Sequence, residues 1–484
     1  MAIAIILSIM IAACSNEPAP DDTPAANTSC QQERQSVPAD TPIFSQNPRQ
    51  LNFIGNAVLA DIGLSAGGSG LAIWSTSNDS PARLYANKVE ILDSGNQSLP
   101  SWENSVRVDS GIDEPAFSPA FSMEPCGNAI LSWQQGGSSW YRTYDLEAGW
   151  GNAMEIDTNP SCSDISINLD KTAFCIYVQA TGDYQAVYSR SYQPPSGWSE
   201  AQRIDNPAEQ NAARTSIAVD ANGNAIAVWL QESPDLTDIY LGLYRENQSN
   251  IWANRYDAVS GWSEPVLIEH LDSWNSHAPK LAMNMDGNAY VTWTYYDRPT
   301  FMSNAQTSIY FNNFSMIAGW GNERILSAGN EINTSNISLS VNALGRGIVS
   351  WNSYHWQNLY LPSVTSRQFD ESGLFSDIQE ISIGPVWAAS TGSPRFFSGV
   401  TNPVSSINDS GQITTVWTSP SFDERLFINT YTPEGAWGDA SLIEGMLDAT
   451  SPKIKMDRFG RSLIAWNRKL TNSSPPNVWA MTTP

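Results

Sequence analysis

Aromatic residues are concentrated in five polar stretches of the chain, where their rings could stack against a ligand. The stretches are residues 232–250, 270–277, 295–307, 353–357 and 385–393, and they contain all three histidines. Flat aromatic faces, with Asp, Asn and Arg side chains for orientation, are typical of a carbohydrate or peptide groove. We therefore predict that the ligand-binding residues include Tyr240, Trp274, Tyr295, Tyr296, Arg298, His355, Trp356 and Trp387. The simpler alternative is that these rings pack their stretches onto the body of the protein.

Two basic residues, Arg214 and Lys280, stand at the same place in consecutive copies of a strand-like pattern. The chain has 49 acidic and 25 basic residues and a net charge of −24, so two cations in one place could receive a carboxylate or a phosphate. The alternative is that each pairs with a neighbouring acid. The same charge balance argues against nucleic acid as a partner, because neutralising phosphates requires clustered Lys and Arg.

Catalytic and metal-binding signatures are weak. Glycoside hydrolysis needs two carboxylates roughly 5–9.5 Å apart, and the aromatic stretches supply Asp235, Asp238, Asp272 and Asp297, so the sequence leaves this chemistry open. No HExxH or CxxC motif occurs, and we predict no metal site. Calcium at Asp220 or Asp286 is the one cofactor the pattern allows, but a turn closed by an Asx side chain explains those residues without an ion.

The secondary-structure elements that position the candidate binding residues form a repeat in the sequence. A phrase made of a small polar turn, a short apolar run and an aromatic residue occurs eight times, for example as AVDANGNAIAVW. The aromatic residues recur at intervals of 44 to 66 residues, the period of four-stranded propeller blades. A core position is their simplest explanation, since a buried indole removes roughly 150–250 Å² from water. They are Trp74, Trp133, Tyr177, Trp229, Trp293, Trp351, Trp417 and Trp466.

We therefore predict an all-β fold, a single β-propeller of eight four-stranded blades over residues 51–484. Seven blades is the alternative, if the weak first or third copy is not a full blade. The last unit stops after its third strand, so we expect residues 35–52 to cover the open edge and both termini to close the ring. In such a ring the aromatic stretches, all from units four to seven, would share one sector of one face.

A second motif marks the third strand of each unit. It reads IWANRY at residues 251–256 and ends in a Gly-Trp turn at Gly261 and Trp262. With the Asp-x-x-Gly-Asn…Val-Trp phrase, it resembles a family of bacterial exported β-propeller repeat lipoproteins. The turn at residues 406–411 (SINDSG) also loosely resembles the Asp-box of sialidase-like propellers. However, the aromatic residue that completes an Asp-box does not follow this turn. The three arginines and the Tyr–Glu nucleophile pair of a sialidase cannot be assigned to positions in this sequence either.

The N-terminus resembles a lipoprotein signal. Residues 2–10 form an apolar run too short to cross a bilayer, and they lead into Ile-Ala-Ala-Cys, which is similar to the bacterial lipobox. The resemblance implies a signal peptide over residues 1–14, a lipid on Cys14 and a Gram-negative outer-membrane location, although no Lys or Arg precedes the run. A periplasmic or secreted protein is the alternative. Residues 15–50 are rich in Pro, Asp and Ala, which predicts a flexible tether.

Four further cysteines bear on whether the protein is exported to an oxidising compartment. Cys162 and Cys175 face each other across a predicted hairpin, so an exported chain could join them in a disulfide; two buried thiols are the alternative. Cys30 and Cys126 could form a second bridge that pins the tether.

These observations predict a surface-exposed lipoprotein that binds a glycan or a protein through an aromatic loop face. We expect a monomer without enzymatic activity, with membrane contact only through the lipid anchor. The alternative is a glycan-active hydrolase or lyase, sialidase-like, on the same scaffold.

Overall fold

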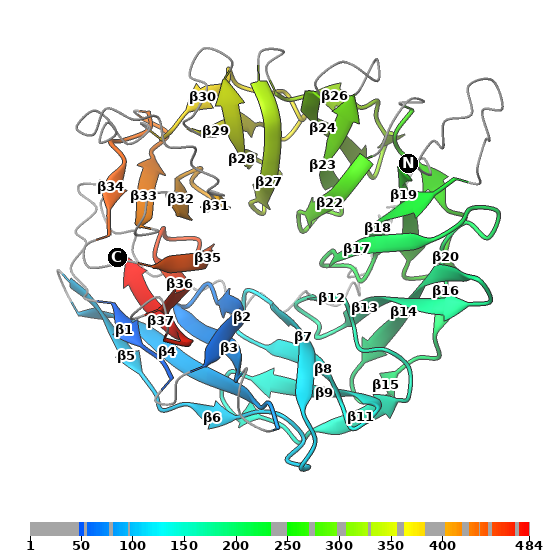
Figure 1. Cartoon of the computed structure of the whole chain (residues 1–484), viewed down its shortest axis with the longest axis horizontal. Coiled ribbons are helices and arrows are strands. Elements are labelled where there is room, and N and C mark those ends of the chain that lie inside the picture. The colour runs from blue at the N-terminus through cyan, green and yellow to red at the C-terminus, as the bar shows by residue number, and fades with distance from the viewer. Residues whose placement is uncertain are drawn as a thin grey trace, which may run out of the picture.

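The structure is a computed structural model that describes residues 48–52, 56–76, 81–94, 97–233, 249–270, 276–297, 306–327, 331–355, 363–382, 402–418, 425–434, 436–443, 448–469 and 474–483. Every regular element in these ranges is a β-strand. The strands form eight antiparallel sheets that follow one another around a ring (Figure 1). The protein is an eight-bladed β-propeller, which confirms the predicted fold and blade count over seven blades.

Each blade begins with a strand near the axis of the ring. The innermost strands of blades 1 to 8 are β2 (Ala57–Leu64), β7 (Ala116–Met123), β12 (Asp164–Ile167), β17 (Ala212–Val219), β22 (Ser276–Met283), β27 (Glu331–Val341), β31 (Val404–Ile407) and β35 (Ala449–Met456). The second strands are β3 (Ser69–Thr76), β8 (Ala129–Gln135), β13 (Ala173–Thr181), β18 (Ala225–Glu232), β23 (Ala289–Asp297), β28 (Gly347–His355), β32 (Ile413–Thr418) and β36 (Ser462–Lys469).

The outer half of each blade carries the second repeated motif. The third strands are β4 (Leu84–Ser94), β9 (Ser138–Asp145), β14 (Tyr184–Gln193), β19 (Ser249–Asp257), β24 (Gln306–Ser315), β29 (Ser363–Phe369), β33 (Leu426–Tyr431) and β37 (Pro476–Thr483). The outer edges are formed by β5 (Gln97–Trp102), β6 (Val106–Arg107), β10 (Gly149–Trp150), β11 (Met154–Asp157), β15 (Gly197–Trp198), β16 (Gln202–Arg203), β20 (Gly261–Trp262), β21 (Val266–Leu267), β25 (Gly319–Trp320), β26 (Arg324–Ile325), β30 (Gln379–Glu380), β34 (Ser441–Leu442) and β1 (Arg49–Gln50).

Alternating strand directions give the ring two faces. The turns from first to second strand and from third to fourth strand lie on one side, which we call the turn face. The connections from second to third strand and from each blade to the next lie on the other side, the loop face. The described ends of the stretches 232–250, 270–277, 295–307 and 353–357 lie on the loop face, and the stretch 385–393 lies outside the described residues.

The repeated aromatic residues form the core, as predicted. Trp133, Trp229, Trp293, Trp351 and Trp466 are completely buried. Each lies on a second strand, and most face an aromatic partner on the third strand; Trp229, for example, is paired with Trp252. The indole nitrogen of Trp229 donates to the side-chain oxygen of Gln231 at 2.9 Å, so the one polar atom of the ring is satisfied.

The polar turn of each repeat is closed by its own side chain. In blade 4 the Asp220 carboxylate accepts the backbone N–H groups of Asn222 and Asn224, each at 2.8 Å, and the side-chain amide of Asn224. Gly223 has a φ of 81°, a left-handed conformation that glycine adopts without steric cost. These bonds explain the turn without an ion.

Side chains also bridge neighbouring blades. The free edge of an innermost strand exposes N–H groups that need partners. Serine hydroxyls of the preceding blade accept several of them, as Ser166 does from Val219 at 3.2 Å and Ser406 from Met456 at 3.0 Å. Further out, the asparagine of the IWANRY motif, Asn254, donates to the Ile204 carbonyl of the preceding blade at 3.0 Å. The polar positions of both motifs therefore hold the blades together.

The ring is closed by both termini, as predicted. The N-terminal strand β1 pairs with the last strand β37, placing Arg49 opposite Ala480 and Gln50 opposite Trp479 (Figure 1). Asn52 adds two bonds across the same joint, accepting the Val478 N–H at 2.8 Å and donating to Asn477 at 2.9 Å. The eighth blade thus takes its outer strand from the beginning of the chain.

The predicted signal peptide, Cys14 and most of the predicted tether lie outside the described residues. A disulfide joins Cys162 and Cys175, whose Cα atoms are 5.3 Å apart. Cys126 is disulfide-bonded as well. Its predicted partner, Cys30, lies outside the described residues.

Within the described ranges, no helix is long and apolar enough to cross a membrane.

Candidate functional site

Most of the predicted aromatic face lies outside the described residues. This holds for Tyr240, Trp274, Arg298, Trp356 and Trp387, and for Asp235, Asp238 and Asp272 among the candidate acids. His355 is the last residue of β28, and its backbone pairs with Glu331 of β27.

Two of the predicted residues are described with their side chains. Tyr295 is only 4% exposed and packs edge-on against Tyr310, with ring centroids 5.4 Å apart. The prediction that it belongs to an exposed face is wrong, because its position on β23 turns it toward the interior of the blade. The next residue, Tyr296, points the other way along the alternating strand and is 39% exposed on the loop face.

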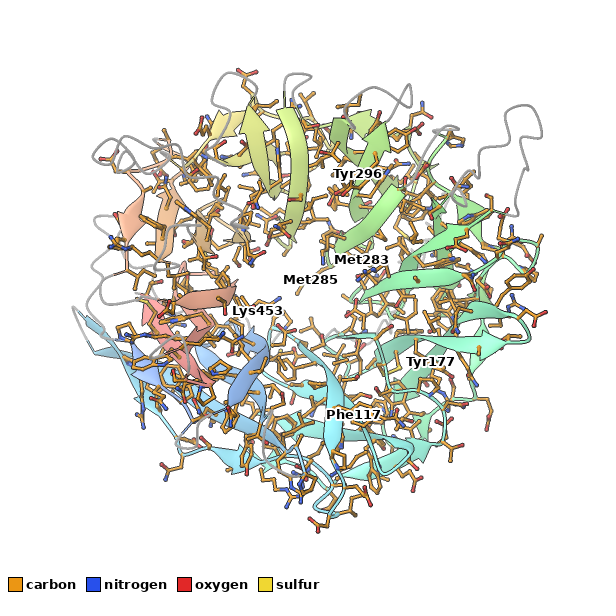
Figure 2. The ribbon with its side chains drawn as sticks, in the orientation of Figure 1. Phe117, Tyr177, Met283, Met285, Tyr296 and Lys453 are labelled. Atoms are coloured by element: carbon orange, nitrogen blue, oxygen red, sulfur yellow. A yellow bond between two sulfur atoms is a disulfide. The ribbon has the colours of Figure 1, made fainter. Side chains whose placement is uncertain are left out.

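Sequence reasoning missed two other exposed rings on the loop face. Phe117, near the start of β7, is 50% exposed, and Tyr184, at the start of β14, is 47% exposed. Figure 2 shows Phe117 and Tyr296 well away from the ring axis, unlike Lys453. Phe117 and Tyr184 lie at strand ends beside short connections, whereas the sequence prediction rested on the aromatic residues of long polar stretches. Together with Tyr296 they offer apolar surface on one face of the ring.

Charged side chains from several blades converge on the ring axis. Lys280 of blade 5 interacts electrostatically with Lys453 of blade 8, Asp164 of blade 3 and Arg214 of blade 4. Residues of such separate blades come within range of one another only across the centre of the ring. We call Asp61, Asp164, Arg214, Lys280 and Lys453 the axial charge cluster.

Strand register explains why four of these residues meet. In each blade, one residue of the innermost strand lies opposite the residue that precedes the repeated aromatic. Asp61 is paired with Ile73, Asp164 with Ile176, Lys280 with Thr292 and Lys453 with Ala465. The equivalent residues in the other blades are Ala120, Ser216, Ser338 and Val404, so these four blades have no charge at this level.

Arg214 and Lys280 are therefore not equivalent, which corrects the sequence interpretation. The register position that matches Lys280 in blade 4 is Ser216, and Arg214 lies two residues before it, where a β-bulge shifts the pairing. Arg214 has a φ of 55°, in the left-handed region that large side chains rarely occupy. Blade 5 has the same bulge, between His277 and Lys280. The offset is therefore present in the sequence itself, where Arg214 precedes Trp229 by 15 residues and Lys280 precedes Trp293 by 13.

The two acids of the cluster already have partners. The Asp61 carboxylate lies 3.3 Å from the Lys453 ammonium. Asp164 accepts from the Ser216 hydroxyl at 2.9 Å and from the Ile217 N–H at 3.0 Å, both in the next blade. Burial of Asp164 raises its pKa, and these hydrogen bonds oppose the rise. Asp61 and Asp164 thus connect blades.

The cations Arg214 and Lys280 have no such partner. Neither makes a hydrogen bond or an ion pair within the part of the chain that the structure describes. The Lys280 side chain is exposed to solvent along the axis, but the surrounding blades exclude part of the water that would otherwise hydrate its ammonium group. This desolvation lowers its pKa, and the like charges of Lys453 and Arg214 lower it further, while Asp164 opposes the change. Among the described residues, the centre of the ring therefore holds two cations that make no hydrogen bond or ion pair.

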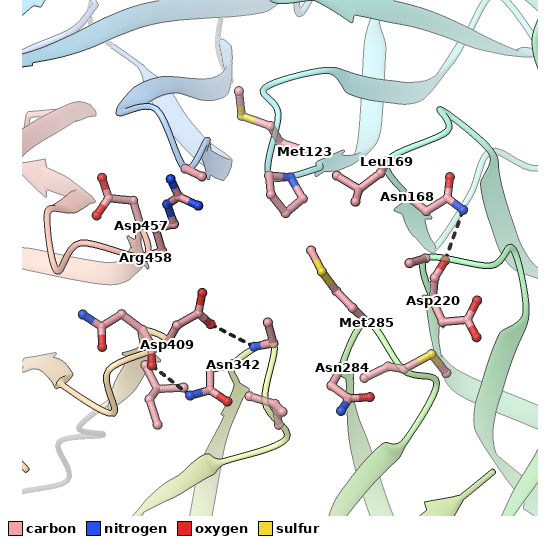
Figure 3. A pocket seen from close by; sticks show the side chains of 18 of the residues that line it. Met123, Asn168, Leu169, Asp220, Asn284, Met285, Asn342, Asp409, Asp457 and Arg458 are labelled. Carbon is pink, nitrogen blue, oxygen red and sulfur yellow. Dashed lines mark hydrogen bonds between the residues drawn. The ribbon is translucent and has the colours of Figure 1, made fainter. Parts of the chain in front are cut away.

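At the turn face, the axis opens into a cavity of about 340 Å³ lined by residues of all eight blades. Its walls come from the ends of the innermost strands and the turns that follow, with Leu169 and Met285 directed into it (Figure 3). Adjoining turns are linked around the rim, as where Asn168 donates to the Asp220 carbonyl at 3.1 Å. This end of the axis is mainly apolar, whereas the charge cluster lies further along the innermost strands.

No group of three or more His, Cys, Asp or Glu side chains within the described ranges could hold a metal ion.

Comparisons with known proteins place the chain only at the level of distant structural similarity. No protein-family model and no curated protein matches it. An ulvan lyase of polysaccharide lyase family PL25 is similar over 75% of this chain and 93% of its own, with a TM-score of 0.45 and 11% identity. A protein of unknown function from Dyadobacter fermentans is similar over 76% and 94%, with a TM-score of 0.41 and 10% identity. An α-L-arabinofuranosidase from Fusarium graminearum is similar over 76% and 92%, with a TM-score of 0.40 and 9% identity. Similarity this distant says nothing about what this chain binds or catalyses.

Proposed function

We propose that this protein is a binding module for a glycan or peptide that carries an anionic group. The ligand lies on the loop face, and its anionic group enters the ring and contacts Arg214 and Lys280. The observation that carries the proposal is the pair of cations without partners among the described residues, in a chain with a net charge of −24.

Two features of the cluster support an anion as the missing partner. Like-charge repulsion between Lys280, Arg214 and Lys453 would be relieved by a carboxylate, sulfate or phosphate bound among them. Moreover, the positive-φ position of Arg214 is occupied by Ser118, Asn336 and Ser451 in other blades. A small polar residue therefore suits the bulge, and a strained arginine there is better explained by a ligand than by folding.

The exposed rings of the loop face suit the remainder of such a ligand. Phe117, Tyr184 and Tyr296 present apolar surface on the side from which a ligand would approach. Sugar rings and peptide side chains both stack on aromatic faces, and polar groups then fix their orientation.

The test compares acidic ligands with neutral ones of the same length. We expect the full chain to bind uronate-containing oligosaccharides or acidic peptides, and Arg214→Ser with Lys280→Ser to weaken that binding by about tenfold or more. Serine occurs naturally at both register positions in other blades. The control is Arg346→Ser, which removes an exposed ion pair with Glu371 on the turn face. Equal binding by both variants would contradict the proposal.

Glycan hydrolysis or elimination is the second candidate on the same scaffold. Asp61 and Asp164 are the acids of the axial charge cluster, and both have contacts between blades. We therefore propose binding without turnover. Release of reducing or unsaturated ends from a bound acidic oligosaccharide would reverse this choice.

We further propose that Cys14 carries a lipid and anchors the protein to a bacterial outer membrane, based on the Ile-Ala-Ala-Cys sequence. Membrane fractionation of a Cys14→Ser variant tests this, because the variant should move to the soluble fraction. A variant that stays with the membrane would show that another feature holds the protein there.

A further inference from the structure

The turn-face end of the axis is surrounded by apolar side chains that share one register position. In every blade, the last residue of the innermost strand is paired with the residue four positions before the repeated aromatic, as Met283 is with Ala289 in blade 5. All eight of these residues are apolar, and all eight line the axial cavity. We call them the apolar collar, and they are Leu64, Met123, Ile167, Val219, Met283, Val341, Ile407 and Met456.

A second ring of residues lies in the turns just beyond the collar. Each of them follows the residue whose side chain closes the turn. Six of the eight are apolar, namely Ala66, Pro125, Leu169, Ala221, Met285 and Ala343. Leu169 and Met285 are directed into the cavity (Figure 3). The other two are Asp409 and Arg458, in the neighbouring turns of blades 7 and 8. The cavity is therefore apolar on most sides and has one polar edge.

The amide side chains that line the cavity are occupied by the turns themselves. The side-chain oxygen of Asn284 accepts the N–H groups of Asp286 at 3.2 Å and Asn288 at 2.9 Å. The side-chain amide of Asn342 donates to the Asn408 carbonyl of the next blade at 2.9 Å. Because these polar atoms are directed at the backbone, a molecule in the cavity would meet mainly apolar atoms.

Packing between the blades holds the collar open. A Cβ placed on Gly63 of blade 1 would lie 2.5 Å from the Cβ of Met123 in blade 2, so the two blades are in close contact here. Val219 and Met283 likewise pack against buried clusters between neighbouring blades. Six of the eight collar residues are nevertheless only partly buried. Since the close-packed core fixes their positions, they cannot move inward to cover the apolar surface that remains.

We propose that this axial cavity binds a small uncharged molecule that is mainly apolar. Residues of all eight blades line the cavity, so it surrounds a small ligand and offers no flat surface to a protein partner. An apolar cavity of about 150 Å³ binds benzene, so a volume of about 340 Å³ admits a molecule of roughly 12 non-hydrogen atoms. The flexible side chains of Met123, Met283 and Met456 suit ligands of varied shape.

The surroundings of the cavity disfavour a charged ligand. An ion that enters apolar surroundings without a partner loses its hydration at a high cost. The polar edge has one residue of each sign, Asp409 and Arg458, so it favours neither anions nor cations.

The axial charge cluster contributes no residue to the lining of the cavity. The collar lies three residues beyond the cluster, as Met283 does beyond Lys280, which corresponds to about 10 Å along the strand. The apolar ligand and the proposed anionic ligand therefore occupy different parts of the axis, and either proposal can fail without the other.

Binding of N-phenyl-1-naphthylamine to the full chain tests the proposal, because this uncharged fluorophore becomes brighter in apolar surroundings. We expect saturable binding that 1-octanol reverses, and that octanoate, its charged counterpart, reverses about tenfold less well. Leu169→Asp with Met285→Asp should weaken binding by about tenfold or more. The turns accept aspartate there, because Asp409 occupies the same position in blade 7. The matched control is Leu344→Asp with Leu374→Asp, which changes exposed apolar residues of the same face outside the cavity and should bind as the parent does.

Any of three results would overturn the proposal. The parent protein shows no saturable fluorescence, or both double variants lose binding equally while keeping the parent's melting temperature. In the third, octanoate displaces the fluorophore better than 1-octanol does, and Lys280→Ser removes that preference. The cavity would then hold the apolar chain of an anionic ligand whose charged end lies at the axial charge cluster.

Discussion

The carboxylate of Asp61 in the first blade and the ammonium of Lys453 in the last blade lie 3.3 Å apart. They occupy the same register position of adjacent innermost strands, although nearly the whole chain separates them. Their pairing leaves Lys280, at the same position in blade 5, without an equivalent acid. Ring closure therefore determines which of the axial cations remain available to a ligand.

Binding of an anionic ligand should depend on pH through Lys280. Desolvation and the neighbouring cations lower its pKa below the ordinary lysine value, so its charge is lost at a lower pH than usual as the solution becomes alkaline. We expect affinity for an acidic oligosaccharide to fall as pH rises through this lowered pKa. Lys280→Arg should keep its affinity over the same range, because arginine stays charged. Titration calorimetry of both proteins across the alkaline range measures this, and identical pH profiles would rule out Lys280 as the titrating group.

Removal of the side chain at the ring closure should destabilise the whole propeller. Asn52→Ala deletes the acceptor of the Val478 N–H and the donor to Asn477, which leaves buried polar groups without partners. We expect a loss of about 1–3 kcal/mol in the free energy of unfolding. Asn152→Ala, at an exposed position, is the control and should change little. Urea titrations provide the comparison, and equal midpoints for the two variants would show that the joint adds no stability.

The repeated tryptophans should each be costly to truncate. Trp229 is completely buried, so Trp229→Ala should reduce the free energy of unfolding by about 3–5 kcal/mol. Trp229→Phe retains an aromatic ring and loses the bond to Gln231, so its effect should be smaller. Reversible denaturant unfolding tests both changes. A loss below about 1 kcal/mol for the alanine variant would contradict a core position.

The surface ion pair between Asp145 and Lys171 should stabilise the folded protein slightly, and this stabilisation should disappear in acid. A hydrogen bond from Lys171, followed by the Ala148 N–H, lowers the pKa of Asp145 to about 2. Because the folded-state pKa lies below the unfolded value of about 3.9, the contribution is present above that value and is lost as pH falls toward the folded-state pKa. Both side chains are more than 40% exposed, so the effect should be small and sensitive to salt.

Thermal unfolding of the wild type, Asp145→Asn and Lys171→Gln at several pH values checks this prediction. Both variants should be slightly less stable than the wild type near neutral pH, and the difference should vanish in strong acid. A difference that persists in acid, or that is unaffected by high salt, would point to packing instead of charge.

The repeating phrase was sufficient to predict the propeller from sequence, because its signals are local. Alternation along a strand, an Asx side chain that closes a turn and a buried ring such as Trp229 act within a few residues. The missing fourth strand of the last unit also predicted where residues near Asn52 must go, since an open edge needs a partner.

Only the tertiary structure decided which side chains meet. The side chain of Tyr295 was expected on a binding face, but strand alternation and the Tyr310 ring place it in the interior. Lys280 and Arg214 are two register positions apart, since Ser216 is the residue of blade 4 that matches Lys280, and the pairing of the strands shows this directly. Lys453 and Asp61 drew no attention, because their contact exists only when the last blade returns to the first. Ring closure brings together residues that are far apart in the sequence, and a repeat read along one chain carries no record of such contacts.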